Sequence, residues 1–122
     1  MHELSIAHNL VEIAICAIQE VQAEQVRTVH LRLGVLSGVA QDALQFGYDI
    51  ATAGTQLAGS RLKIEELPVV IYCAKCQAEY TLPDIQWFAC PVCATPTSTI
   101  VQGREIEIES LEIIDGNPNP RN

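Results

Sequence analysis

Basic residues, aromatic residues and long apolar runs are all scarce in this sequence of 122 residues. Only 7 Lys and Arg oppose 15 Asp and Glu, and the resulting net charge of −8 argues against nucleic acid as the main partner. Aromatic residues make up 5% of the chain, too few for a surface on which bases stack. No apolar run approaches the roughly 20 residues of a membrane-spanning helix, and the N-terminus lacks the basic segment of a secretory signal. We therefore expect a cytoplasmic protein that binds neither nucleic acid nor membrane.

Apolar residues account for 48% of the chain, which is typical of a protein that folds around a hydrophobic core. The length favours one domain, or one domain that carries a small insert. Five cysteines are present, and an odd number without a signal peptide does not indicate a disulfide framework. Because four of them form two close pairs, they favour a metal site in a reducing compartment.

Apolar periodicity predicts two helices and three strands. The helices are expected over residues 3–23 and 40–53, the second with Leu44, Gly47, Ile50 and Ala51 inward. The strands are expected over residues 26–36, over 61–71 and from residue 104 onward. Pro68 marks an edge or a place where the chain leaves the sheet, and a β-bulge near Ser110 would explain a shift of apolar phase.

This order of elements predicts an α+β fold, with a three-stranded sheet covered on one face by two helices. The cysteine pairs lie between the second and third strands, so they form an inserted zinc-ribbon-like module whose two ends join the sheet. We expect residues 1–70 and 99–116 to form one α/β domain, which includes the N-terminus, and residues 71–98 to form a zinc-binding domain. Residues 117–122 are expected to be a disordered tail.

The four paired cysteines follow a pattern of two tight knuckles separated by thirteen residues: Cys73-x2-Cys76 and Cys90-x2-Cys93. Two residues between paired cysteines let both thiolates face one ion, and two such knuckles close a tetrahedron without an open position. This donor set favours structural Zn(II), while redox iron or a dithiol uses the same spacing and stays open. We expect Trp87 and Phe88 to pack beside the site.

The N-terminus Met1-His2-Glu3 offers a second set of donors. The amine of Met1, the amide nitrogen of His2 and its imidazole form fused chelate rings that favour square-planar Ni(II) or Cu(II). The fourth corner remains for Glu3, through its amide or carboxylate, or for an outside ligand. A plain solvated histidine ahead of a helix is the alternative interpretation.

Other polar residues and the fifth cysteine have ordinary structural interpretations. His8 is expected at the surface, His30 as structural or solvated, and Cys16 as a small packing residue. An acidic run in the last strand indicates a solvated strand face, or a docking surface for a basic partner; its members are Glu105, Glu107, Glu109 and Glu112.

Four segments together resemble the HypA/HybF family of nickel metallochaperones for [NiFe]-hydrogenase maturation. They are the start Met1-His2-Glu3-Leu4-Ser5, the segment at 29–34, the paired cysteines and the segment at 105–108. The resemblance implies that Met1, His2 and Glu3 bind nickel and that the four paired cysteines hold structural zinc. It also implies a HypB-type GTPase and a hydrogenase large-subunit precursor as partners, with urease as a client of some members.

The sequence departs from some relatives in having no histidine beside the knuckles, where Gln77 and Ala94 stand. A histidine ligand to nickel from the cysteine module is therefore excluded. No nucleophile–base pair or phosphate-binding glycine loop is apparent, so we expect no enzymatic activity. A zinc-ribbon adaptor that binds protein or nucleic acid without nickel is the alternative, and an iron redox carrier is a third class. We expect a monomer or a weak, domain-swapped dimer.

Overall fold

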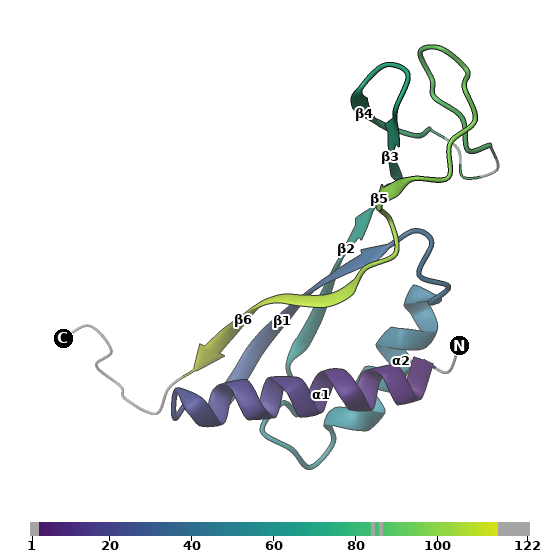
Figure 1. Ribbon diagram of the computed structural model, residues 1–122. Helices are drawn as coiled ribbons and strands as arrows, with labels where there is room; N and C mark the ends of the chain where they lie inside the picture. Colours follow the sequence, from purple (N-terminus) through teal and green to yellow (C-terminus); the bar gives the residue numbers. More distant parts are fainter. Residues whose placement is uncertain (1–2, 84, 86, 115–122) are drawn as a thin grey trace. The chain divides into compact units, whose positions relative to one another are not determined.

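Two helices and six strands are present among the residues that the computed structural model describes, which are 3–83, 85 and 87–114 (Figure 1). The elements are α1 (Glu3–Glu20), β1 (Gln25–Gly34), α2 (Gln41–Thr52), β2 (Arg61–Leu67), β3 (Val70–Cys73), β4 (Ala78–Thr81), β5 (Ile100–Gln102) and β6 (Ile106–Ile114). Within the described ranges, no helix combines the length and the apolarity needed to cross a membrane.

The chain divides into two units. The helical unit contains the described residues of 3–31, 39–65 and 108–114, and the cysteine unit contains those of 32–38 and 66–107. The segment 71–98, expected to bind zinc, lies within the cysteine unit, which also takes in neighbouring chain on both sides. The expected tail at 117–122 lies outside the described residues.

The first sheet has the strand order β2-β1-β6, and α1 and α2 pack together over one of its faces (Figure 1). The arrows of β1 and β2 run in the same direction and that of β6 in the opposite one (Figure 1). Along β1, Val29 and Leu31 are almost fully buried, whereas His30 between them is half-buried. This alternation confirms the expected α+β arrangement of a three-stranded sheet with its helices on one side.

Helix α1 ends three residues earlier than its apolar stripe predicts. The Gln22 N–H donates to the Gln19 carbonyl (3.2 Å) and the Ala23 N–H to the Ile18 carbonyl (2.9 Å). Gln22 has a φ of +58°, so these bonds form a Schellman cap with glutamine where glycine is usual. Val21, which falls within the helix expected over residues 3–23, therefore lies beyond the end of α1 and is exposed.

Helix α2 buries most of the residues predicted to face inward, namely Leu44, Gly47 and Ala51. Ile50 was expected inward and is instead 48% exposed. Tyr48 takes a central place in the core, with its hydroxyl 2.6 Å from Ser60 Oγ, and burial raises its pKa.

The cysteine unit contains a second sheet with the strand order β4-β3-β5. Strands β3 and β4 form an antiparallel hairpin in which Val70 pairs with Thr81 and Cys73 with Ala78. The prediction of one strand over residues 61–71 was wrong, because β2 ends at Leu67 and β3 begins in the other sheet. Pro68 lies between these two strands, where the chain leaves the first sheet. This is one of the two alternatives that the sequence predicted for Pro68.

Strand β6 shows the change of phase that the sequence indicates. Ile106 and Ile108 are half-buried, Glu109 and Ser110 are successive exposed residues, and the half-buried Leu111 resumes the pattern. A β-bulge at this point remains the interpretation of this pattern.

Candidate metal centre

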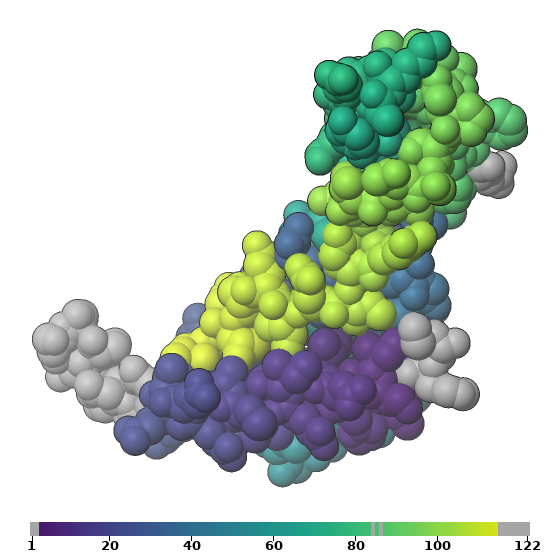
Figure 2. Space-filling view, viewed as in Figure 1, coloured from purple at the N-terminus to yellow at the C-terminus, as the bar shows by residue number. Residues whose placement is uncertain are grey.

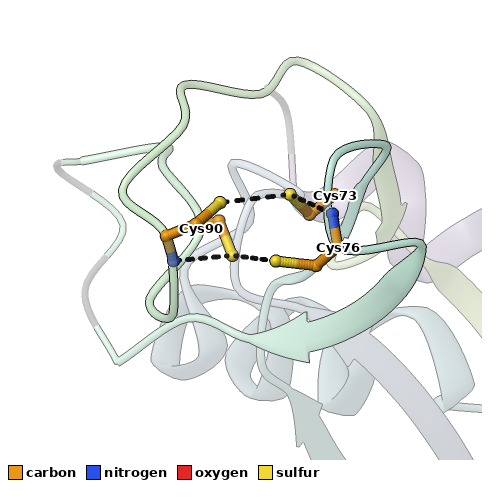
Figure 3. Close-up of side chains that lie close together, drawn as sticks. Cys73, Cys76 and Cys90 are labelled. Atoms are coloured by element: carbon orange, nitrogen blue, oxygen red, sulfur yellow. Dashed lines mark hydrogen bonds between the residues drawn. The ribbon is translucent and has the colours of Figure 1, made fainter.

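The sulfur atoms of Cys73, Cys76, Cys90 and Cys93 all lie within 4.8 Å of one another. Cys73 Sγ is 3.6 Å from Cys93 Sγ, and Cys76 Sγ is 3.9 Å from Cys90 Sγ. Figure 3 shows Cys73 and Cys76 facing Cys90 across this centre. Four sulfur atoms at about 2.3 Å from a central zinc ion would be separated by about 3.8 Å, so the observed spacing fits a tetrahedral site.

Both knuckles have the same backbone geometry. In the first, the Gln77 N–H donates to the Cys73 carbonyl (2.7 Å) and the Cys76 N–H to Cys73 Sγ (3.4 Å). Gln77, which follows the second cysteine, has a φ of +56°. This turn points both thiols toward one position, and the N–H donor favours a sulfur that carries negative charge.

The second knuckle repeats these contacts. The Ala94 N–H donates to the Cys90 carbonyl (2.8 Å), and the Cys93 N–H donates to Cys90 Sγ (3.5 Å). Ala94 has a φ of +64°, matching Gln77 in the first knuckle. A short hairpin holds the turn, since the Cys90 N–H donates to the Thr95 carbonyl (2.9 Å). The two Cys-x2-Cys segments are therefore equivalent half-sites.

One cysteine of each knuckle belongs to an apolar cluster. Cys73 and Cys90 are 1% and 2% exposed and pack with Val69, Ile71 and Leu82, while the second cysteine of each knuckle is half-buried. The site is thus held from one side by a small hydrophobic core. A bound metal would add the stabilisation that such a small core lacks.

The thiols of the metal-free cluster differ in acidity. The Thr95 hydroxyl, 3.1 Å from Cys93 Sγ, and the Thr95 backbone lower the pKa of Cys93 to about 6. The hydrogen bond with Cys93 and burial raise the pKa of Cys76 to about 12. Cys93 is thus the more acidic of these two thiols, and a metal ion that binds both must displace the proton on Cys76, so metal binding releases protons.

The fifth cysteine lies apart from this cluster. Cys16 was expected to be a packing residue, but it is exposed. It belongs to α1, the helix that forms the purple band of Figure 2. His8 is exposed on the same helix, as expected. Trp87 and Phe88 were expected to pack beside the metal site: Trp87 lines a pocket together with Cys90 and Pro91, although its side chain is 73% exposed, and Phe88 is 36% exposed.

One of the three residues expected to bind nickel, Glu3, is the first residue of α1. Met1 and His2 lie outside the described residues, whereas Glu3 is described. Glu3 Oε2 accepts a hydrogen bond from the backbone N–H of Ala40 (3.1 Å), at the N-terminus of α2. Sequence reasoning missed this contact, because alanine is no capping residue and its acceptor lies 37 positions earlier.

The acidic run of the last strand is partly paired with β1. Glu112 lies 2.8 Å from His30 Nε2, and Glu107 lies 3.1 Å from Arg32 Nη1. The hydrogen bond with His30 lowers the pKa of Glu112. His30 therefore has a structural partner, which is one of the two roles expected for it.

The family model described as "Hydrogenase/urease nickel incorporation, metallochaperone, hypA" matches residues 1–113. The chain belongs to the HypA family. Two relatives named hydrogenase maturation factor HypA are each 53% identical. That of Roseiflexus sp. aligns over 97% of this chain and 96% of its own length, and that of Chloroflexus aurantiacus over 92% and 98%.

The fold agrees with solved structures of the HypA family. The solution structure of the Ni metallochaperone HypA from Helicobacter pylori aligns with a TM-score of 0.69, covering 94% of this chain and 99% of that chain. A second solution structure of a HypA protein aligns with a TM-score of 0.70. Both are 21% identical to this chain, so they establish the fold alone.

Family membership confirms the resemblance inferred from the sequence. The chain is a nickel metallochaperone of hydrogenase maturation with a four-cysteine metal site, and it is a maturation factor rather than an enzyme. Both the N-terminal segment and the two knuckles fall within the matched range.

Proposed function

We propose that this HypA-family protein binds one Ni(II) ion at its N-terminus and delivers it to a [NiFe]-hydrogenase large-subunit precursor. The nickel ligands are the Met1 amine and the amide nitrogen and imidazole of His2, with Glu3 beside them. The observation that carries the proposal is the family match, which runs from residue 1 and includes the Met-His-Glu start.

The described start of α1 supports this assignment. Glu3 is the first residue of α1 and directly follows the proposed ligands Met1 and His2 in sequence, so its backbone amide is the next nitrogen donor along the chain. One oxygen of the Glu3 carboxylate, Oε2, accepts a hydrogen bond from the Ala40 N–H, which fixes the position of this side chain at the start of α1. The fourth corner of the nickel site remains for Glu3, through its amide or carboxylate, or for an outside ligand.

Structural zinc is the proposed occupant of the cysteine cluster. The four thiolates leave no open position, and their spacing fits a tetrahedron with bonds of about 2.3 Å. Zn(II) has no redox chemistry, and because its d shell is filled it imposes no geometry of its own and accepts a tetrahedral set of ligands. A colourless protein with one zinc per chain is expected, whereas a coloured one would indicate the iron alternative.

The proposed setting follows from the family. We propose a cytoplasmic location, a HypB-type GTPase as partner and a monomer or weak, domain-swapped dimer, with urease as a further client. Binding of purified precursor and GTPase, together with sedimentation velocity, tests these points.

Nickel titration by calorimetry tests the N-terminal site. Native protein should bind one Ni(II), while His2→Ala and a variant with two residues added before Met1 should lose this binding. The extension keeps every side chain but converts the amine into an amide. His8→Ala is the matched control, because it removes an exposed histidine of α1 and should leave nickel binding unchanged.

Proton competition gives a second readout. The amine and imidazole must lose protons to bind metal, so nickel affinity should fall as pH drops from about 8 to 6. If the extended protein binds nickel as tightly as the native one, the terminal amine is not a ligand and the proposal is wrong.

A further inference from the structure

Three large apolar side chains are exposed near the start of α1 and the middle of α2. Phe46 is 70% exposed, Ile50 48% and Leu4 44%. Phe46 and Ile50 are four residues apart on α2, so they lie on the same side of that helix. Phe46 is one of only two phenylalanines in the chain, and most of its side chain lies outside the hydrophobic core.

Leu4 adjoins this pair because the two helices touch at Gly47. A Cβ atom at Gly47 would lie 3.3 Å from Leu4 Cα and 3.5 Å from the Glu3 carbonyl oxygen. The absence of a side chain at this position thus brings the first turn of α1 against α2. Leu4, Phe46 and Ile50 form one apolar patch, here named the helix patch.

The helix patch lies beside the proposed nickel ligands. Glu3 precedes Leu4 directly, and its carboxylate holds the Ala40 N–H at 3.1 Å. Together with the contact at Gly47, this bond ties the start of α1 to the first half of α2. A protein that covers the helix patch would therefore also reach Glu3, which directly follows the proposed ligands Met1 and His2 in sequence.

The charged side chains of the two helices that carry the helix patch are all acidic. Helices α1 and α2 contain five acidic residues and no Lys or Arg: Glu3, Glu12, Glu20, Asp42 and Asp49. All seven basic residues of the chain lie outside the two helices. Asp42 and Asp49 stand four residues before and three after Phe46, so they border the patch on α2.

We propose that the helix patch docks a partner protein whose apolar pocket is bordered by Lys or Arg side chains, and that nickel is exchanged under this contact. The proposal rests on the proposed N-terminal nickel site for the exchange step, but not for the docking step. A second copy of this chain is a poor occupant, because two acidic faces would repel each other.

Affinity measurements with two purified probes test the docking: the cognate HypB-type GTPase and the hydrogenase large-subunit precursor. Phe46→Ser should weaken binding of at least one probe tenfold or more, as expected for an aromatic anchor at the centre of an interface. Val21→Ser is the matched control, since Val21 is 63% exposed just beyond the other end of α1, and it should change the affinity less than twofold.

The acidic border has its own test. The double variant Asp42→Asn/Asp49→Asn should bind the same probe more weakly, with a shallower dependence on salt, because two charge contacts are lost. All variants should keep the melting temperature of the native protein within a few degrees, since the altered side chains are exposed.

Three results would overturn the proposal. They are no binding of either probe by native protein, unchanged affinity of Phe46→Ser for both probes, and a native dimer that Phe46→Ser converts to a monomer. Nickel titration of native protein separates the two proposals. If native protein binds no Ni(II), the nickel assignment is refuted, while the affinities for the two probes still decide whether the helix patch docks a partner.

Discussion

We expect Cys73→Ser to weaken zinc binding more than Cys76→Ser, because the two sulfur atoms differ in burial. Cys73 is 1% exposed and packs in the apolar cluster with Ile71 and Leu82, whereas Cys76 is half-buried. A water molecule can approach the site when Cys76 is lost. The serine hydroxyl at position 73 would instead be a weak ligand in an apolar environment.

The magnitude follows from the number of ligands. Structural zinc contributes roughly 10–16 kcal/mol in small zinc-finger peptides, so one thiolate of four accounts for about 3 kcal/mol. That corresponds to about a hundredfold change in affinity. Cys73→Ser should therefore weaken zinc binding at least a hundredfold, and Cys90→Ser similarly, since Cys90 is 2% exposed.

Competition with a chromophoric chelator measures these affinities, and Co(II) substitution reports the number of thiolates through its absorption. Cys16→Ser is the control, because Cys16 is exposed and lies outside the cluster. Equal losses in Cys73→Ser and Cys76→Ser would refute the argument from burial. Loss of zinc in Cys16→Ser would refute the ligand set itself.

Three further changes have outcomes that the structure predicts. Ala94→Gly should stabilise the zinc-loaded protein by about 0.5–1 kcal/mol in chemical denaturation, because φ is +64° there; a loss of stability would contradict this. Gly34→Ala should destabilise by about 3 kcal/mol or more, since its Cβ would lie 2.1 Å from the Gly103 carbonyl carbon; an unchanged melting temperature would show that the backbone adapts. The hydrogen bond with His30 lowers the pKa of Glu112 below that of an unfolded chain, so its stabilisation is complete above about pH 4.3 and is lost as pH falls through the lower folded value. Glu112→Gln should flatten this acid limb of the stability curve, and identical limbs in both proteins would speak against the contact.

Apolar periodicity was sufficient to locate the two helices and strands β1 and β6, because each has a buried face, but it joined β2 and β3 into one strand. It failed at helix ends, where local hydrogen bonds decide. Gln22 adopts a left-handed conformation that the sequence does not signal, since glycine usually occupies it. It also failed at Ile50, whose place on α2 leaves it at the edge of the buried stripe.

The cysteine spacing was enough to predict which four sulfur atoms meet, because each knuckle is a local turn. The supporting contacts were not predictable. Thr95 follows the second knuckle as an ordinary polar residue, yet its hydroxyl lies 3.1 Å from Cys93 Sγ. The bond from Ala40 to Glu3 joins residues far apart in sequence, so only the packing of α1 on α2 reveals it.

The chain passes between its two units four times, after residues 31, 38, 65 and 107. A peptide of residues 71–98 would keep all four sulfur ligands but lose Val35, Leu36, Val69 and Ile100, which pack around them. Because the chain crosses four times, a single proteolytic cut cannot release the cysteine unit. Limited digestion should yield cut protein whose fragments stay associated. Transplanting the metal centre into another scaffold would require two separate segments of chain.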